Sequence, residues 1–417
     1  MTVKYNPFKP GNIVGPGMFA GRLEELLSLE KSLFQTKHGN ALHFLIKGER
    51  GIGKSSLLYS LQTIAAGELD SISCGKFNFL VMNIALEPSN TYLDLIGKVG
   101  SEYKRVLKDE MHVKAFLVDA WDFLKKWEVM GVKYSAGVAG VQPYEALDDL
   151  VSHVSGSLKS VKDKVDGLLI LIDEADKPKP SANLGEFCKL FTERLSKRGC
   201  NNVCLGLAGL PSVTQKLKQS HESSIRLFNI TDLDPLNDNE VDEVIDKALA
   251  MARKVNQHDT VIDSDAKSFL VTLSEGYPHF IQQFGYCAFD QDKDNKIDII
   301  DVVSGALSEG GAFHQLGQKY FDELYFDQIG SDEYREVLKA MAERGNSWIS
   351  KKELQEKLSI KPYTLNNALA ALKKKNIVAP RPGKSGEYRL PLVSFAVWIK
   401  GFAQAKEIQQ RQMEFKR

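Results

Sequence analysis

Four short apolar runs in the first half of the chain predict buried β-strands. They occupy residues 41–46, 79–84, 168–172 and 202–208. In 168–172 five aliphatic side chains follow one another without alternation, which is typical of a central strand covered on both faces. Helical patterns such as 56–61 separate the runs. This alternation predicts an α/β fold with a parallel sheet and right-handed crossovers.

The pattern changes after residue 330. Apolar residues recur at helical spacing over 334–341 and 365–372. Residues 350–353 form a capping box that opens a short helix between these two. Residues 377–379 and 387–390 flank a turn rich in Gly and Pro, which predicts a β-hairpin. Three helices followed by a hairpin are the elements of a winged helix-turn-helix.

The 417-residue chain has a globular composition, with 43% hydrophobic and 26% charged residues. This composition excludes an intrinsically disordered protein. The longest aliphatic run has five residues, far short of the roughly 20 apolar residues of a membrane-spanning helix. The N-terminal residues lack the apolar core of a signal peptide. We therefore expect a soluble, cytoplasmic protein without a membrane partner.

The net charge of +0 conceals an uneven distribution. From residue 331 onward there are 18 Lys and Arg against 9 Asp and Glu, which gives this part a net charge of +9. Residues 1–330 carry the balancing −9. Segregated basic charge is typical of proteins that bind an acidic partner such as nucleic acid.

The five cysteines are odd in number and scattered along the chain. This pattern predicts reduced thiols rather than a disulfide framework. Cys200 and Cys204 form a C-x₃-C without a second pair of ligands nearby, so we expect no zinc site there.

Residues 48–55 match G-x-x-x-x-G-K-[ST], the Walker A phosphate loop of NTPases. A predicted strand precedes the loop and a predicted helix follows it, which is the context that the motif requires. Glycines let the backbone N–H groups surround a phosphate, Lys54 reaches the β- and γ-phosphates of ATP, and the Ser55 hydroxyl is a ligand of Mg²⁺. The candidate nucleotide contacts of this loop are Gly48, Glu49, Arg50, Gly51, Ile52, Gly53, Lys54, Ser55 and Ser56.

Two carboxylates, Asp173 and Glu174, follow the aliphatic run 168–172. They stand at the carboxyl end of a strand, where open α/β sheets bind ligands. We predict that Asp173 holds Mg²⁺ and that Glu174 activates the attacking water. Residues 173–176 also spell D-E-A-D, the string of DEAD-box helicases. The other helicase motifs, S-A-T and H-R-x-G-R, do not follow, so we interpret the string as a coincidence.

The box formed by Phe19, Gly21, Arg22 and Glu25 precedes Walker A, and a G-x-P and the winged helix come later. This ordered set, over roughly residues 7–400, resembles the origin-recognition-like ATPases, the archaeal-ATPase and STAND relatives of the AAA+ group.

The resemblance implies roles for particular residues. The segment of the box lies against the adenine in such proteins, so the candidates for the base pocket are Ile13, Val14, Phe19 and Arg22. Pro278, in Gly276–Pro278, corresponds to the lid proline that contacts nucleotide. Arg226 stands where AAA+ relatives place an arginine finger, which acts on a neighbour's γ-phosphate and requires self-association. The alternative for Arg226 is a surface residue that precedes a strand.

Two positions depart from the family pattern. After the strand at 202–208 the family has a polar residue near the γ-phosphate, whereas this sequence has Ala208 and Gly209. In the lid, Pro278 and His279 stand where many members have a sensing arginine. A slow nucleotide switch fits these departures as well as a fast motor does.

Residues 290–301 resemble a calcium-binding EF-hand loop, because oxygen-bearing side chains fall at positions 1, 3, 5, 9 and 12. Asn295 replaces the usual glycine, although Asn tolerates the left-handed conformation. Asp301 replaces the bidentate glutamate. The alternative is an acidic connector in which Asp298 begins the next helix.

The winged helix presents amide, hydroxyl and aromatic groups among cations, which suits double-stranded DNA. The candidate DNA contacts are Lys361, Tyr363, Thr364, Asn367, Lys373, Lys374, Arg381, Lys384 and Arg389. The alternative is a winged helix that contacts an unidentified protein partner or autoinhibits the ATPase.

The predicted organisation is a P-loop core at 1–235, a helical lid at 236–330, a winged helix at 331–400 and a charged helix at 401–417. We expect an Mg²⁺-dependent ATPase, a hydrolase that acts as a nucleotide switch. One hypothesis is a DNA-binding switch of the initiator or mobile-element kind. A second is a STAND-type signalling or defence switch, and a third is a transcription regulator that binds ATP without turnover.

Overall fold

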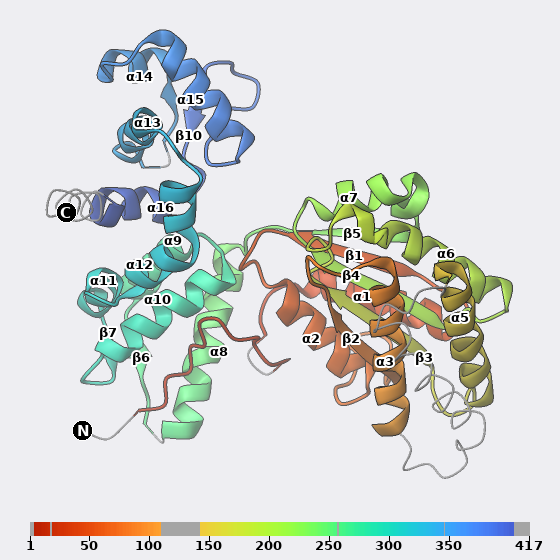
Figure 1. The fold of residues 1–417 in the computed structure, drawn as a ribbon. Helices are drawn as coiled ribbons and strands as arrows, with labels where there is room; N and C mark the ends of the chain where they lie inside the picture. The colour runs from red at the N-terminus through yellow and green to blue at the C-terminus, as the bar shows by residue number, and fades with distance from the viewer. Residues whose placement is uncertain (1–3, 17–18, 110–141, 257, 346, 404–417) are drawn as a thin grey trace, which may run out of the picture. The chain divides into compact units, whose positions relative to one another are not determined.

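The computed structural model describes residues 4–16, 19–109, 142–256, 258–345 and 347–403. It contains two compact units, Ile13–Asp234 and a second unit that joins Met1–Asn12 to Pro235–Arg417 (Figure 1). A hairpin is predicted for the glycine-rich stretch 131–140 and a helix for 401–417. Residues 131–140 lie outside the described residues, and so do residues 404–417.

The first unit is built on a five-stranded parallel sheet with the strand order β2-β3-β4-β1-β5. The strands are β1 His43–Gly48, β2 Phe79–Ala85, β3 Gly167–Asp173, β4 Val203–Gly209 and β5 Phe228–Leu233. The four predicted strands are present within two residues of their expected bounds, and the predicted α/β fold with a parallel sheet is confirmed. Because β4 lies between β1 and β3, the ends of the two motif-bearing strands are one strand apart.

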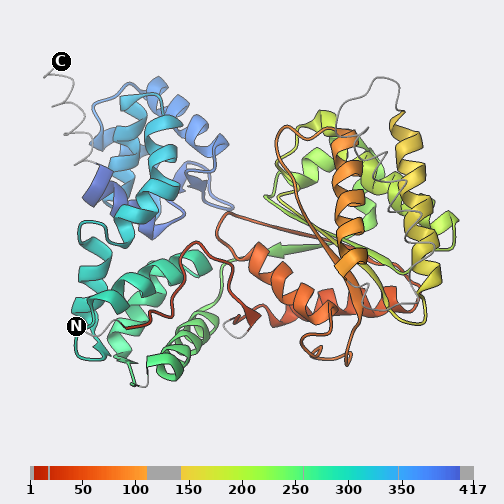
Figure 2. The same ribbon diagram turned by 60° about the horizontal axis from the view of Figure 1, so that its bottom comes forward.

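Helices cover both faces of this sheet (Figure 2). One face packs against α3 Tyr92–Asp109, α5 Pro143–Ser160 and α6 Leu184–Lys197. The other packs against α1 Leu23–Lys37 and α2 Lys54–Ala65. A short helix, α7 Val213–Ser220, follows β4 and contacts α6.

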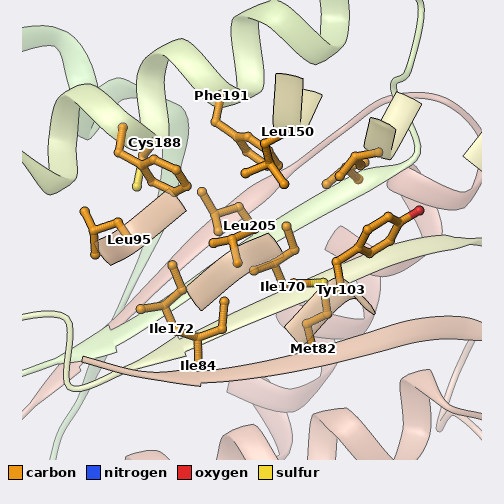
Figure 3. Packing of buried hydrophobic residues seen from close by; sticks show 14 of the residues in the cluster. Met82, Ile84, Leu95, Tyr103, Leu150, Ile170, Ile172, Cys188, Phe191 and Leu205 are labelled. Carbon is orange, nitrogen blue, oxygen red and sulfur yellow. The ribbon is translucent and has the colours of Figure 1, made fainter. Parts of the chain in front are cut away.

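The core explains why β3 is uninterruptedly aliphatic. Ile170 and Ile172 point into the layer that also holds Phe191 of α6 (Figure 3). Leu169 and Leu171 lie on the opposite face, because successive strand residues alternate, and they are equally buried. A strand covered on both faces needs apolar side chains at every position.

The second unit contains a group of lid helices followed by a winged helix. The lid elements are α8 Asp238–Asn256, β6 Val261–Ile262, α9 Ser264–Ser274, α10 Pro278–Gln291, β7 Lys296–Ile297, α11 Ile299–Leu307 and α12 Ala312–Leu316. Two π-helical segments, Gly317–Phe321 and Glu323–Asp327, lead to the winged helix. Within the described residues, none of the helices is long and apolar enough to span a membrane.

The winged helix has the predicted helices and hairpin and one further strand. Its elements are α13 Asp332–Ala342, β8 Ile349–Ser350, α14 Lys351–Lys357, α15 Pro362–Lys374, β9 Ala379–Pro380, β10 Glu387–Arg389 and α16 Val393–Trp398, with the π-helical segment Ile399–Ala403 after them. Ser350 and Glu353 form the predicted capping box at the start of α14. The strand β8 pairs with β10 and completes an antiparallel sheet of order β8-β10-β9.

The N-terminal segment belongs to the second unit because it is bonded to the lid helices. The backbone N–H of Tyr5 donates to Asn256 Oδ1 at 2.7 Å, and that of Lys9 donates to Gln282 Oε1 at 2.7 Å. Phe8 is buried against Gly285, where a Cβ would lie 2.5 Å from the ring. The glycine in α10 thus provides the space for this aromatic ring.

A matched pair of glycine substitutions tests the packing of the sheet. A Cβ at Gly206 of β4 would lie 2.2 Å from the ring of Phe44, which is fully buried and has no room to move. We expect Gly206→Ala to lower the free energy of unfolding by about 1–3 kcal/mol through overpacking. Gly97→Ala, in α3 with nothing within 4 Å, should raise it by about 0.5–1 kcal/mol.

Urea unfolding followed by circular dichroism measures both effects. The double variant Phe44→Leu/Gly206→Ala should recover part of the loss, because it removes the atoms that the new methyl group meets. A Gly206→Ala variant as stable as the wild type would contradict this account of β4.

Candidate nucleotide-binding site

Three glycines shape the loop between β1 and α2. Gly51 and Gly53 have φ angles of 80° and 100°, a left-handed conformation that favours glycine. A Cβ at Gly48 would lie 2.8 Å from a side-chain carbon of Ile52 and 3.1 Å from Cβ of Leu233. The loop ends at the N-terminus of α2, whose first N–H groups have no partner inside the helix. This arrangement suits an anionic phosphate.

Lys54 lies over this loop. Its ammonium group donates to the carbonyl oxygens of Gly48 at 2.7 Å and Glu49 at 2.8 Å. Burial lowers the pKa of Lys54, whereas the charges of Asp173 and Asp176 oppose that shift. A partly desolvated cation is a strong partner for phosphate oxygens.

The two Walker motifs meet at the carboxyl edge of the sheet. The hydroxyl of Ser55 donates to Asp173 Oδ2 at 2.7 Å, and the other oxygen of Asp173 accepts from the N–H of Glu174 at 2.7 Å. A hydroxyl and a carboxylate at this distance fit Mg²⁺, which prefers oxygen ligands. The structure therefore brings together the two residues predicted as metal ligands.

Glu174 has an unusual backbone for a residue with a side chain. Its φ is 54°, and the loop is held by the N–H of Ala175, which donates to the carbonyl of Ala208 at 2.9 Å. The carboxylate of Glu174 is 45% exposed and pairs with Lys177 at 2.5 Å. Such strained residues cluster at functional sites.

The N-terminal box lies beside this site. The N–H of Val14 donates to the Ser56 hydroxyl at 3.2 Å, and Phe19 is half-buried, whereas Ile13 is 56% exposed. The guanidinium of Arg22 is buried and pairs with Glu25 at 3.1 Å. It also donates to the carbonyls of Ile52 and Asp234. Through these bonds Arg22 holds the N-terminal box against the glycine-rich loop after β1.

Asp176 has no predicted role, because the D-E-A-D string at 173–176 is interpreted as a coincidence. In the structure its carboxylate lies at the end of β4, where Oδ1 accepts from the N–H of Leu210 at 2.8 Å. The signal available in the sequence was the D-x-x-D spacing after β3 together with the missing side chain at Gly209.

Arg226 is exposed, as expected for an arginine that acts on a neighbour. It lies in the 3₁₀ helix Glu222–Leu227, directly before β5. Within the described part of the chain its side chain makes no recorded hydrogen bond or ion pair. An exposed side chain is consistent both with an arginine finger and with a surface residue that precedes a strand.

The G-x-P of the second unit has a steric basis. Gly276 has a φ of 73°, and a Cβ there would lie 2.2 Å from the carbonyl oxygen of Leu236. Pro278 is the first residue of α10. The preceding Glu275 is half-buried. Its carboxylate accepts from the N–H and hydroxyl of Ser394, at 3.0 and 2.5 Å, and from the N–H of Val393. Burial raises the pKa of Glu275. This residue is not among the site residues predicted from the sequence.

The candidate DNA contacts fall into two groups. Lys361, Lys373 and Lys374 of α15 are exposed and form no recorded ion pair within the described residues, and Tyr363 is 75% exposed. Thr364 and Asn367 lie on the same helix and are partly buried.

The cations of the wing already have partners. Arg381 pairs with Glu387 at 2.7 Å, and Lys384 also pairs with Glu387. Arg389 stacks on Trp348, with its guanidinium carbon 4.8 Å from the ring centre. Sequence reasoning found the three cations but missed Glu387 and Trp348, because their contacts depend on strand pairing.

The acidic groups of 290–301 also have partners. Asp292 is buried, pairs with Lys4 at 3.0 Å and accepts from the N–H of Lys296 at 3.1 Å. Asp298 and Asp301 form a capping box at the start of α11. Asn295 has the left-handed φ of 69°. The bonds favour an acidic connector over a calcium loop, and the described residues contain no group of three or more His, Cys, Asp or Glu arranged to hold a metal ion.

Cys200 and Cys204 are free, buried thiols. Burial raises the pKa of Cys200 to about 11 and that of Cys204 to about 12. Cys204 Sγ donates to the carbonyl of Leu42 at 3.1 Å.

The chain was compared with protein families and with curated proteins. No protein-family model matches it. An uncharacterized HTH-type transcriptional regulator of Methanocaldococcus jannaschii is 25% identical over 412 residues, which cover 94% of this chain and 91% of the relative.

Two solved structures match over nearly the whole length. The Walker-type ATPase of Pyrococcus abyssi has a TM-score of 0.57 and 18% identity, with 92% of this chain and 96% of the other covered. The ORC2 protein of Aeropyrum pernix, solved as ADPNP-ADP complexes, has a TM-score of 0.56 and 14% identity, with 97% and 99% covered. The chain therefore has the fold of these ATPases, and its predicted resemblance to origin-recognition-like ATPases is confirmed at the level of the fold.

Proposed function

We propose that this protein is an Mg²⁺-dependent ATPase that acts as a slow nucleotide switch and binds double-stranded DNA through its winged helix. The observation that carries the proposal is the hydrogen bond between Ser55 and Asp173, which joins the two Walker motifs. The fold shared with a Walker-type ATPase supports nucleotide binding. The HTH-type transcriptional regulator among its relatives supports a role at DNA.

The chemistry is an in-line attack of water on the γ-phosphorus of ATP. The new P–O bond forms as the bond to the β–γ bridging oxygen breaks, and Glu174 takes the proton of the water. Lys54 neutralises charge on the β- and γ-phosphates. Bound Mg²⁺, held by Ser55 and Asp173, supplies further charge neutralisation. The ion pair of Glu174 with Lys177 competes with its role as a base, which supports slow turnover.

The adenine pocket is formed by Ile13, Val14 and Phe19. Arg22 acts by fixing this segment to the loop, since its guanidinium is bonded to Glu25 and to backbone carbonyls. Arg226 acts on the γ-phosphate of a neighbouring molecule.

A second candidate function is the STAND-type switch, in which the winged helix contacts a protein. The observation that favours it is Glu387, which forms ion pairs with two of the wing cations and offsets one of their charges. In either function the half-buried Glu275 connects the corner before Pro278 to α16 of the winged helix through hydrogen bonds. A change at the lid is then passed to the winged helix.

Glu174→Gln tests the enzymatic part of the proposal. We expect ATP affinity to be retained and phosphate release to fall by about 10²–10⁴-fold, because the amide cannot take the proton. Fluorescent-nucleotide titration and a phosphate-release assay measure the two quantities. Glu193→Gln, in an exposed pair with Lys189 on α6, is the matched control. Unchanged phosphate release in Glu174→Gln would remove Glu174 from its role.

Arg226→Ala tests the action in trans. Turnover per molecule of the wild type should rise with protein concentration to a plateau. At the concentration of that plateau, the turnover of the variant should be about 10³-fold lower. Arg253→Ala, which removes another exposed arginine, should behave as the wild type. Equal turnover of Arg226→Ala and the wild type at high concentration would contradict an arginine finger.

Lys373→Ala/Lys374→Ala tests DNA binding by α15. Loss of two phosphate contacts should weaken binding to all duplexes alike and reduce the slope of log K against log salt by about 2. Fluorescence anisotropy at several salt concentrations measures the slope, with Lys247→Ala on α8 as a control. Negligible affinity of the wild type at low salt, with and without ATP, would exclude the DNA function and favour the protein-contacting switch.

A further inference from the structure

Strand β4 ends between the two strands that carry the Walker motifs. Its residue Gly209 pairs with Lys47 of β1, and Leu207 pairs with Ile172 of β3. A side chain at this end would therefore stand between Lys54 and Asp173, next to the γ-phosphate. The last two residues of β4, Ala208 and Gly209, offer no polar group of their own.

Asp176 fills the space that Gly209 leaves. A Cβ at residue 209 would lie 2.8 Å from Asp176 Oδ1 and 3.1 Å from its amide nitrogen. The φ of Gly209 is outside the left-handed region, so the glycine is required by this close approach and not by its backbone. The polar group at the end of β4 thus comes from the loop after β3.

Several bonds hold Asp176 at this position. Its Oδ1 accepts from the N–H of Leu210 at 2.8 Å. Its carbonyl accepts from the ammonium of Lys216, which also donates to the carbonyl of Pro178 at 3.1 Å. Oδ2 makes no recorded hydrogen bond with the part of the chain that the structure describes, and the side chain is half-buried. One oxygen is therefore anchored and the other is available.

We infer that Asp176 is a further catalytic residue of this site, whose Oδ2 accepts a hydrogen bond from the attacking water and orients it toward the γ-phosphorus. Glu174 takes the proton of the water, so the step transfers no proton to Asp176. The negative charge of Asp176 favours the ammonium form of Lys54. This inference rests on the proposed ATPase function.

Asp176→Asn separates a role with water from a structural role. The N–H of Leu210 is a donor, so it selects the carbonyl oxygen of the new amide as its acceptor. The NH₂ group then faces the water and cannot accept from it. We expect kcat to fall about 10- to 100-fold with the affinity for ATP unchanged, and the melting temperature to stay near that of the wild type.

Two further variants sharpen the test. Asp148→Asn removes one charge from an exposed pair with Arg194 and should leave kcat unchanged. Asp176→Ala should lose activity, and Gly209→Asn in that background should restore part of it, because the amide oxygen then comes from β4 itself. The remaining approach of 3.1 Å to the backbone at residue 176 requires only a small shift.

The outcomes distinguish this inference from the proposed function. Wild-type turnover with an equal or higher kcat in Asp176→Asn would overturn the role of Asp176 and leave the ATPase intact. A wild-type protein that binds Mg·ATP without releasing phosphate would overturn both. A lower kcat in Asp176→Asn with partial rescue by Gly209→Asn in Asp176→Ala supports the assignment.

Discussion

The hydrogen bond from the Ser55 hydroxyl to the Asp173 carboxylate depends on a single constraint, the parallel direction of β1 and β3. Parallel strands end at the same edge of a sheet, so residues 118 positions apart meet there. The glycine-rich loop, the predicted metal ligands Ser55 and Asp173, and Glu174 all lie at this edge. A reversed strand would place Asp173 at the opposite edge and leave Lys54 without its acidic neighbours.

Close backbone packing determines which side chain lies at the end of β4, between the strands that carry the two Walker motifs. Gly206 makes room for Phe44 in the core, and Gly209, three residues further along the same strand, makes room for the Asp176 carboxylate. Strand β4 therefore has a glycine where it packs against the core and another at the carboxyl edge of the sheet. The polar group comes from a neighbouring loop, which is fixed by bonds to β4.

Two carboxylates, one half-buried and one buried, connect parts of the second unit. Glu275 lies in the corner before the G-x-P and caps α16, and Asp292 pairs with Lys4 of the N-terminal segment. A buried carboxylate that lost these partners would cost free energy, so the contacts bind the lid, the winged helix and the N-terminal segment into one body. In the winged helix, Glu387 lowers the effective charge of the wing, whereas Lys373 and Lys374 of α15 are exposed.

Much of this architecture follows from local signals in the sequence. Apolar runs without alternation give the buried strands, G-x-x-x-x-G-K-S gives the loop, and the capping box at Ser350 gives the start of α14, because each depends on neighbours in the chain. Long-range packing decided the rest. The pairing of Glu387 with the wing cations and the bonds of Arg22 to Ile52 and Asp234 join residues that no motif links. The D-x-x-D spacing records the position of Asp176 in the chain but not its contact with Gly209. The order of the strands, which only the folded sheet reveals, is what brings these groups to one edge.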